Sequence, residues 1–303
     1  EKLISKGNIV TIVDDLSTGH ISNLGTIIKH PSLKIIIGSI LDDNLMEPII
    51  KEVDEVYHLA SAVGVKLIMD QPVEIIENIF EGTAVVFRFA ARYRKKVLLT
   101  STSEVYGKNK NVPFKEDYDR IEGPTSSHRW AYASAKSLDE FLALAHSKKS
   151  GLAVVVVRLF NTVGPRQSSQ YGMVIPNFIE AALKGETLYV YGDGEQTRCF
   201  CHVKDVVKAL VDVMNNVKCE GKVFNIGSSE EISINKLANR ITSFTKSDSK
   251  IKTIPYNQVY PDGGFEDMGR RVPSTERIKK YISWDPKISL DEIIKSVVES
   301  KQH

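Results

Sequence analysis

The chain has 303 residues, of which 42% are hydrophobic and 26% are charged. This is the composition of an ordinary globular protein, and it excludes an intrinsically disordered chain. Lysine and arginine number 40 against 38 aspartate and glutamate residues, so the net charge is +2. With so even a balance, we expect no nucleic-acid partner and no membrane-surface partner.

The length fits one large domain or two smaller ones. No apolar run reaches the roughly 18 residues that a membrane-spanning helix needs, and the first residues lack the layout of a signal peptide, so we expect a cytoplasmic protein. Three cysteines are a small and odd number, typical of free thiols in a reducing compartment.

Short, nearly continuous apolar runs alternate with helical patterns in the first half of the chain. The expected strands cover residues 9–13, 34–37, 55–59, 97–100 and 154–159, and the expected helices include 82–93 and 132–145. Strands that are apolar on both faces are covered by helices on both sides. This order predicts an α/β fold with a doubly wound parallel sheet.

After Gly164 and Pro165 the pattern loosens. Shorter strands are expected at 188–191, 222–226 and 251–254, Ser233 and Ser289 are expected to cap helices, and residues 231–240 are expected to be helical. We therefore expect a first domain at residues 1–165. Residues 166–303 are expected to form mainly a smaller lobe, with some segments returning to the sheet.

Tyr132 and Lys136 lie four residues apart on a predicted helix, so they share one helix face. An ammonium beside a phenol favours the phenolate and lowers the tyrosine pKa from about 10 towards neutrality. Such a pair would be a general base for a hydroxyl group. By itself this pattern is common on solvent-exposed helices. It indicates a catalytic site only together with other polar segments of the chain.

One such segment follows the strand at 97–100. Polar side chains at the carboxyl end of a parallel strand lie where doubly wound folds bind ligands. Thr102 would hydrogen-bond the hydroxyl or carbonyl that is being interconverted, and Glu104 would supply a second acid or base. The alternative is a polar turn that merely ends the strand.

Seven segments resemble, in order and spacing, the extended short-chain dehydrogenase/reductase family, and within it the NAD-dependent nucleotide-sugar epimerases, dehydratases and decarboxylases. They are residues 13–19, 58–61, 101–107, 132–136, 158–166, 191–198 and 224–227. The resemblance covers essentially the whole chain. It implies a Rossmann-type doubly wound sheet that binds NAD and a smaller C-terminal substrate-binding lobe for a nucleotide sugar, most simply a UDP-sugar.

The resemblance also implies the residues that bind NAD. Asp14 would accept hydrogen bonds from the adenosine ribose and so favour NAD over NADP. The implied NAD contacts are Asp14, Asp15, Leu16, Ser17, Thr18, Ser39, Ile40, Leu59, Ala60, Ser61, Thr100, Ser101, Tyr132, Lys136 and Leu159.

Catalytic and substrate roles follow from the same resemblance. Tyr132 is implied as the base, Lys136 as its partner and Thr102 as the neighbouring hydroxyl, with Glu104 as a further acid or base. The implied substrate contacts are Ser103, Asn161, Val174, Asn177, Tyr189, Tyr191, Arg198 and Arg271. Of these, Asn161, Arg198 and Arg271 would hold the diphosphate, with Arg270 as an alternative to Arg271.

The sequence departs from the family in three places. The family opens with a glycine-rich turn that binds the cofactor pyrophosphate, and since this chain begins without it, we expect about twenty further residues upstream. The alternative is a variant with impaired cofactor binding. Ser39 replaces an aspartate, and Ile79 replaces an asparagine. Cys199, Cys201 and His202 have no second ligand pair, so no metal is expected.

The chemistry shared by the family is transient oxidation at C4 of the sugar. We favour a UDP-sugar 4-epimerase of the UDP-glucose type, with a UDP-glucuronate decarboxylase or a 4,6-dehydratase that uses Glu104 as the alternative. A non-catalytic sugar-nucleotide-binding protein is a second alternative. Residues 102–104 favour the decarboxylases and dehydratases, whereas residues 132–136 and 265–268 differ from typical UDP-glucuronate decarboxylases.

The resemblance finally implies a homodimer built from two helices of each subunit, one of them carrying Tyr132. Phe141 and Leu142 are apolar residues available on that helix.

Overall fold

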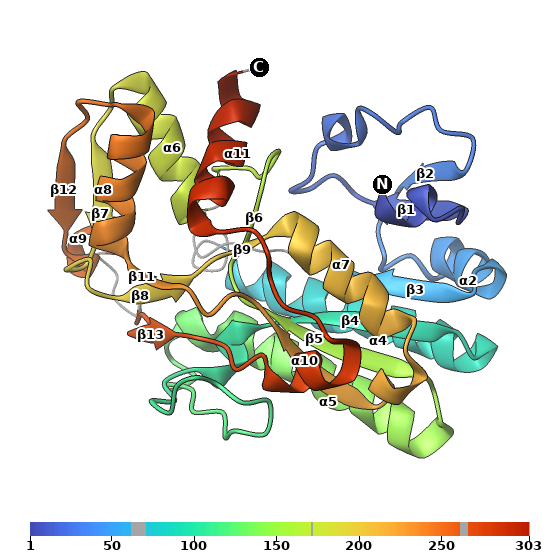
Figure 1. Cartoon of the computed structure of the whole chain (residues 1–303). Coiled ribbons are helices and arrows are strands. Elements are labelled where there is room, and N and C mark those ends of the chain that lie inside the picture. Colours follow the sequence, from blue (N-terminus) through green and yellow to red (C-terminus); the bar gives the residue numbers. More distant parts are fainter. Residues whose placement is uncertain (62–70, 171, 261–265, 303) are drawn as a thin grey trace.

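The computed structural model describes residues 1–61, 71–170, 172–260 and 266–302, so Phe265 of the segment 265–268 lies outside the described residues. A parallel sheet with helices on both faces makes up one part of the molecule, and a lobe of small sheets and helices lies at its end (Figure 1). The Rossmann-like α/β architecture predicted from the sequence is therefore present.

The main sheet has four parallel strands in the order β10-β5-β4-β3. They are β3 (Glu55–His58), β4 (Lys96–Thr102), β5 (Val154–Leu159) and β10 (Lys222–Ile226). Residues 154–157 of β5 are fully buried, as expected for a strand that is covered on both faces. The register pairs Thr102 with Leu159, so the carboxyl ends of β4 and β5 meet at the same edge.

The first two strands form a sheet of their own. β1 (Val10–Asp14) and β2 (Leu33–Ile37) are parallel partners, and within the described part of the chain neither is hydrogen-bonded to β3. The short helix α1 (Lys2–Ser5) precedes them, and the 3-10 turn η1 (Ile21–Leu24) lies between them. The single parallel sheet expected from the sequence is thus divided into two, and Ile9 and Ile37 at the small sheet are exposed.

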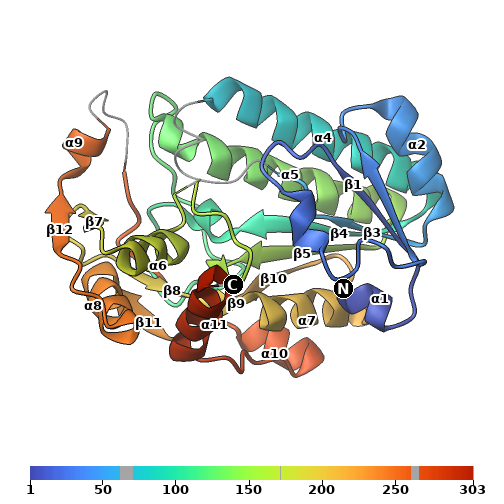
Figure 2. The ribbon, with the colours of Figure 1, turned by 90° about the horizontal axis from the view of Figure 1, so that it is seen from above.

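Helices cover the main sheet from both sides, and Figure 2 shows these layers from above. On one side lie α2 (Asp43–Glu52), α4 (Pro72–Tyr93) and α5 (Ala131–Ser150), which share a core with β4 and β5. On the other side lie α7 (Val203–Met214) and α10 (Glu276–Ile282), whose core includes Trp284. Because α7, β10 and α10 all come after residue 165, the second half of the chain contributes to these layers as well as to the lobe.

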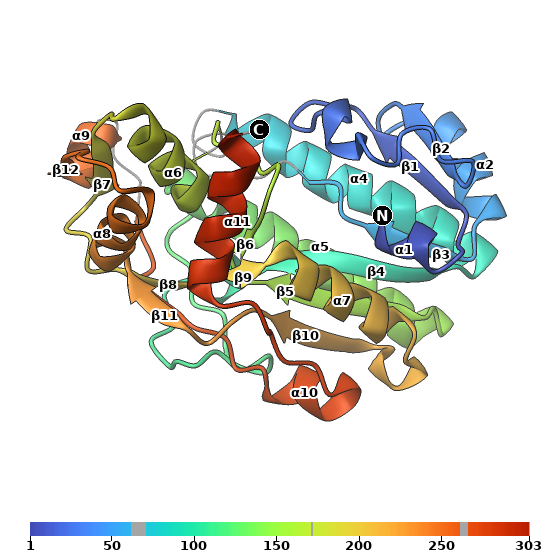
Figure 3. The same cartoon turned by 45° about the horizontal axis from the view of Figure 1, so that its top comes forward.

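The lobe is built from short strands and three helices around one apolar core (Figure 3). Its helices are α6 (Val174–Lys184), α8 (Ile234–Thr245) and α11 (Leu290–Gln302), with the short α9 (Tyr256–Val259) at the edge. Its strands are β7 (Leu188–Tyr191) paired with β12 (Ile251–Ile254), and β11 (Glu231–Ser233), β8 (Thr197–Cys199) and β13 (Arg270–Arg271) in one sheet. β6 (Thr162–Val163) pairs with β9 (Cys201–His202) where the lobe joins the sheet.

Two helix starts in the lobe agree with the sequence, and one expected helix begins three residues later. The Ser233 hydroxyl accepts from the Lys236 amide, and Ser289 and Glu292 bond each other's backbone amides. The expected helix at 231–240 is wrong at its start: residues 231–233 are strand β11, because they pair with β8, and the helix begins at Ile234.

Candidate active site

A cavity of about 1570 Å³ lies where the carboxyl ends of β4 and β5 face the lobe. This is the edge at which doubly wound folds bind ligands. Many of the residues expected from the sequence line it together, including Thr102, Glu104 and Tyr132. The other expected residues on its wall are Leu59, Ser61, Thr100, Ser101, Leu159, Ser103, Asn161, Val174, Asn177, Tyr189, Tyr191, Arg198 and Arg271.

Tyr132 lies in the first turn of α5, 8% exposed, on the wall of this cavity. The hydroxyl groups of Ser61 and Thr102 are its neighbours. Thr102 also begins the 3-10 turn η2 (Ser103–Tyr106), since its Oγ1 accepts from the Glu104 amide at 3.2 Å. The local fold therefore turns the polar residues after β4 towards the phenol.

Lys136 does not have the partner expected from the sequence. Its ammonium donates to the Asp139 carboxylate at 2.9 Å, and both side chains are buried. Burial raises the pKa of Tyr132 instead of lowering it, and the charge of Glu104 adds to this rise. The hydroxyl groups of Ser61 and Thr102 lower the pKa, but their effect is smaller. The expected lowering is thus wrong for this structure, because Asp139 compensates the lysine charge and the phenol is out of water.

Glu104 is buried between two arginines on the wall of the cavity. Its Oε2 accepts from Arg129 at 2.5 Å and its Oε1 from Arg271 at 3.4 Å. Burial opposes the ionisation of Glu104, but the charges of Arg129 and Arg271 outweigh it and lower the pKa of the carboxyl to about 2. At neutral pH this group is a carboxylate, able to accept a hydrogen bond or a proton but not to donate one.

Sequence reasoning missed Arg129. It lies in the 3-10 turn η3 (His128–Trp130) just before α5, 1% exposed, with its guanidinium over the Trp130 ring. Arg129 stands three residues before Tyr132, a spacing that places two residues on the same face of a helical segment. In the sequence, the signal for Arg129 is the arginine itself, three residues before Tyr132.

Arg271 and Arg198, expected at the diphosphate, both line the cavity and each pairs with a carboxylate. Arg271 contacts Glu104, whereas Arg198 bonds Asp267 at 2.5 Å and the Met268 carbonyl at 2.8 Å. Arg270, the alternative to Arg271, is exposed and pairs with Glu231, which leaves Arg271 as the arginine of this pair on the cavity wall.

The opposite end of the cavity is aromatic. Tyr189 and Tyr191 alternate with buried residues along β7 and are about half exposed towards the cavity. Val174 and Asn177 on α6 line the same end. Asn161, expected at the diphosphate, donates to the Cys199 carbonyl at 2.8 Å and adopts a positive φ of 29°.

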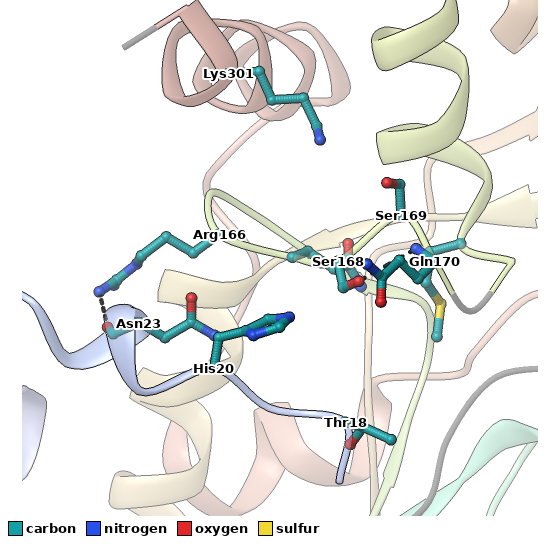
Figure 4. A pocket seen from close by; sticks show the side chains of 10 residues that line it. Thr18, His20, Asn23, Arg166, Ser168, Ser169, Gln170 and Lys301 are labelled. Atoms are coloured by element: carbon teal, nitrogen blue, oxygen red, sulfur yellow. Dashed lines mark hydrogen bonds between the residues drawn. The ribbon is translucent and has the colours of Figure 1, made fainter. Parts of the chain in front are cut away.

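The expected adenosine-binding residues lie away from this cavity, in and after β1. Asp14 Oδ1 accepts from the Leu16 amide at 2.8 Å, in a turn in which Leu16 has a φ of 59°. Thr18 lines a second cavity of about 410 Å³ together with His20, Asn23 and the segment from Arg166 to Gln170. Figure 4 shows this pocket, with Arg166 reaching the Asn23 carbonyl and Lys301 on the far side.

The residues around β3 and β4 fit a bound dinucleotide. Leu59 is 53% exposed at the end of β3, an apolar surface on the cavity wall. The buried Ser61 hydroxyl faces the Tyr132 phenol and has no further hydrogen-bond partner within the described part of the chain. The hydroxyl groups of Thr100 and Ser101, in contrast, already donate hydrogen bonds within the protein. Thr100 donates to the His58 carbonyl and Ser101 to the Glu140 carboxylate, which also pairs with Arg158.

No cluster of His, Cys, Asp and Glu suited to a metal ion occurs among residues 1–61, 71–170, 172–260 and 266–302. Cys199, Cys201 and Cys219 are buried free thiols. In the same described residues, no helix is both long and apolar enough to cross a membrane.

A Rossmann-like sheet, a buried tyrosine–lysine helix at its carboxyl edge and a large cavity facing a second lobe define the architecture of the short-chain dehydrogenase/reductases. A family model described as GDP-mannose 4,6 dehydratase matches residues 1–297. The chain belongs to this extended family of NAD-dependent nucleotide-sugar epimerases and dehydratases, so the expected family and its cofactor are confirmed at that level.

Curated relatives with decarboxylase names cover nearly the whole chain. A UDP-N-acetyl-alpha-D-glucosaminuronate decarboxylase from Bacillus cytotoxicus is 43% identical, over 99% of this chain and 92% of the relative. UDP-glucuronic acid decarboxylase 1 from Danio rerio is 35% identical, over 99% of this chain and 68% of the relative.

Among solved structures, the UDP-glucose 4-epimerase of Thermotoga maritima with UDP-glucose is 29% identical, with a TM-score of 0.88. The match covers 99% of this chain and 93% of the epimerase.

Proposed function

We propose that the protein is a UDP-hexuronate decarboxylase that oxidises C4 of the sugar transiently and releases the C6 carboxylate as carbon dioxide. The observation that carries this proposal is Glu104, held ionised between Arg129 and Arg271 beside Tyr132. A 43% identical relative with a decarboxylase name supports the same choice. The proposal replaces the 4-epimerase that we favoured from the sequence with its alternative.

The chemistry explains why C4 oxidation precedes carbon loss. A ketone at C4 makes the C6 carboxylate a β-keto acid, because C5 lies between them. When the C5–C6 bond breaks, its electron pair moves to C5 and the C4 oxygen, and carbon dioxide leaves. A proton then adds to C5, and a UDP-4-keto-pentose results. NAD, when bound, supplies the hydride acceptor for C4 and the hydride donor for its later reduction.

Each side chain has a distinct part in this proposal. Tyr132, in its phenolate form, takes the proton of the 4-hydroxyl, and Thr102 and Ser61 hold the oxygen that becomes the ketone. Arg129 and Arg271 attract the sugar carboxylate, since a guanidinium suits a carboxylate. Glu104 keeps those arginines in place and, as a carboxylate, accepts hydrogen bonds from the sugar.

The remaining assignments follow the cavity from end to end. The Leu59–Ser61 segment, Thr100 and Lys136 would hold the nicotinamide half of NAD, and residues 14–18 the adenosine half. Tyr189 and Tyr191 would stack on the nucleobase, with Val174 and Asn177 beside it. Arg198 and Asn161 would lie along the diphosphate.

The test is a product analysis with NAD and three separate substrates: UDP-N-acetylglucosaminuronate, UDP-glucuronate and UDP-glucose. We expect either uronate to lose the mass of carbon dioxide and to give UDP-pentose signals in proton NMR. The two uronates distinguish a 2-acetamido from a 2-hydroxy sugar. Conversion of UDP-glucose to UDP-galactose without reaction of the uronates would reject the decarboxylase.

The 4-epimerase is the second candidate because the Thermotoga maritima structure with UDP-glucose matches 99% of this chain with a TM-score of 0.88. Glu104→Gln separates the two. A decarboxylase is expected to lose turnover when the charge between Arg129 and Arg271 is removed, whereas a 4-epimerase needs no second carboxylate for its chemistry and is expected to keep its rate.

We also propose that the protein is a homodimer through α4 and α5. These helices pack on each other and leave apolar side chains exposed on their outer surface. The residues are Val73, Ile76, Phe80, Leu138 and Phe141. Phe141 is 60% exposed, which is large for an aromatic side chain on a helix.

A further inference from the structure

Behind the tyrosine–lysine helix lies a buried polar network that extends beyond the family motifs, since Thr83 and Asp139 belong to none of the seven segments. Lys136 and Asp139 are neighbours on α5, 2% and 0% exposed. The Thr83 hydroxyl on α4 lies near the Asp139 carboxylate and acts to lower its pKa. Thr83 Oγ1 in turn lies 2.9 Å from Nε2 of His58, the last residue of β3.

The network connects two walls of the site. His58 directly precedes the Leu59–Ser61 segment on the cavity wall, and its carbonyl accepts from Thr100 of β4. Lys136 and Tyr132 are one helical turn apart on α5. Asp139 therefore gives the helix that carries the base a polar contact towards α4 and β3, beside the apolar packing of α4 on α5.

Charge and position give Asp139 a second effect. An ammonium that is matched by a carboxylate at 2.9 Å exerts a much weaker field on a third group than an isolated ammonium does. The Asp139 charge itself also acts against ionisation of Tyr132. Both effects have the same sign, since each favours the neutral phenol.

We propose that Asp139 is a positioning residue: by holding the Lys136 ammonium in this buried network, its carboxylate sets how readily Tyr132 gives up its phenol proton. The inference rests on the role of Tyr132 as the base in the proposed function. It names a side chain three residues beyond Lys136 that neither touches the cavity nor contacts the substrate.

Other charged groups around the base are already paired, so they are expected to change little in a titration near neutral and alkaline pH. Glu104 on η2 is held by Arg129 and Arg271, and Glu140 on α5 by Arg158 of β5. Burial, and then the charge of Lys136, lowers the pKa of His58 to about 3, so this ring is neutral.

Asp139→Asn is the decisive variant. Asparagine has the same shape and still accepts a hydrogen bond from Lys136, so a purely structural role would be preserved while the charge is lost. The measurement is the phenolate absorbance of NAD-loaded protein between pH 8 and 12.5, a range that extends well above the ordinary tyrosine pKa of about 10 because burial raises the pKa of Tyr132. The chain has 11 tyrosines, and subtracting the matching Tyr132→Phe variant isolates Tyr132.

In Asp139→Asn we expect the Tyr132 midpoint to fall by about one pH unit, the size of effect that a nearby charge has. Asp212→Asn is the matched control, because Asp212 pairs with Lys208 on the exposed face of α7 and its loss is expected to leave the midpoint unchanged. Curves for Asp139→Asn that coincide with wild type over this range, or that move to higher pH, overturn the proposal.

Two additions keep the test decisive. If Asp139→Asn does not fold, as judged by circular dichroism, Asp139→Ser removes the same charge with a smaller polar side chain, and a fall of the Tyr132 midpoint is again expected. An unchanged midpoint in that variant overturns the proposal. The titration needs no sugar substrate, so its outcome stands apart from whether the protein decarboxylates any UDP-hexuronate.

Discussion

Replacing Glu104 by glutamine tests the charge arrangement at the centre of the site. The carboxyl has a pKa of about 2 in the folded protein against an ordinary value of 4.5. A carboxylate with a lowered pKa stabilises the fold fully above its unfolded pKa, and this contribution is lost as the pH falls towards 2. The difference between the two pKa values corresponds to about 3 kcal/mol at neutral pH.

We therefore expect Glu104→Gln to lose about 3 kcal/mol of unfolding free energy at pH 7, because Arg129 and Arg271 are left buried without their carboxylate. The difference in unfolding free energy between wild type and variant is expected to become about 2 kcal/mol smaller between pH 7 and pH 3. Urea unfolding followed by tryptophan fluorescence at several pH values measures both quantities.

Glu180→Gln provides the contrast. The pKa of Glu180 is also lowered to about 2, chiefly by Lys184, but this pair lies at the surface. Solvent screening reduces its contribution to under about 1 kcal/mol. The reasoning about Glu104 and its two arginines would be refuted if the loss of unfolding free energy in Glu104→Gln stayed constant from pH 7 to pH 3. A loss equal to that of Glu180→Gln would refute it as well.

The fold and the site support three further predictions. Tyr132→Phe removes the phenol oxygen and is expected to abolish turnover while nucleotide-sugar affinity, measured by calorimetry, changes less than about twofold; wild-type rates would contradict the base assignment. Phe141→Glu is expected to convert a dimer into a monomer in sedimentation analysis without loss of secondary structure, and an unchanged sedimentation coefficient would exclude the α4–α5 face as the interface. Gly107→Ala is expected to destabilise the fold far more than Gly151→Ala. Both glycines have positive φ, which costs alanine about 1–2 kcal/mol, but a Cβ at Gly107 would lie 2.2 Å from the Ile121 carbonyl oxygen, whereas Gly151 has open space; equal denaturation midpoints would contradict this.

Local patterns predicted much of the fold, because strands buried on both faces are short, apolar and easily recognised. The strands at 188–191, 222–226 and 251–254 have the expected bounds. The start of α8 was displaced because residues 231–233 pair with β8, a long-range contact with no local signal. The separation of β1 and β2 from β3 likewise depends on which strands hydrogen-bond to each other, and the local sequence does not reveal this.

The candidate site was predictable where motifs follow one another along the chain, and less so where partners come from afar. Tyr132, Thr102 and Glu104 line one cavity, as their positions after β4 and on α5 suggested. The partner of Lys136 was not predictable, since Asp139 at three residues competes with Tyr132 at four on the same helix. The contact of Glu104 with Arg271 spans 167 residues, which no spacing argument reveals.

The edge position of β10 has a consequence for how the chain can be divided. β10 covers one edge of β5, yet its residues 222–226 come long after Pro165, where a first domain would end. A fragment ending at Pro165 would leave that edge of β5, with its apolar residues 154–157, open to other chains. Unpaired, apolar strand edges of this kind promote aggregation. The sheet is completed only when residues 222–226 have been synthesised, so the two halves of the chain are expected to fold as one cooperative unit.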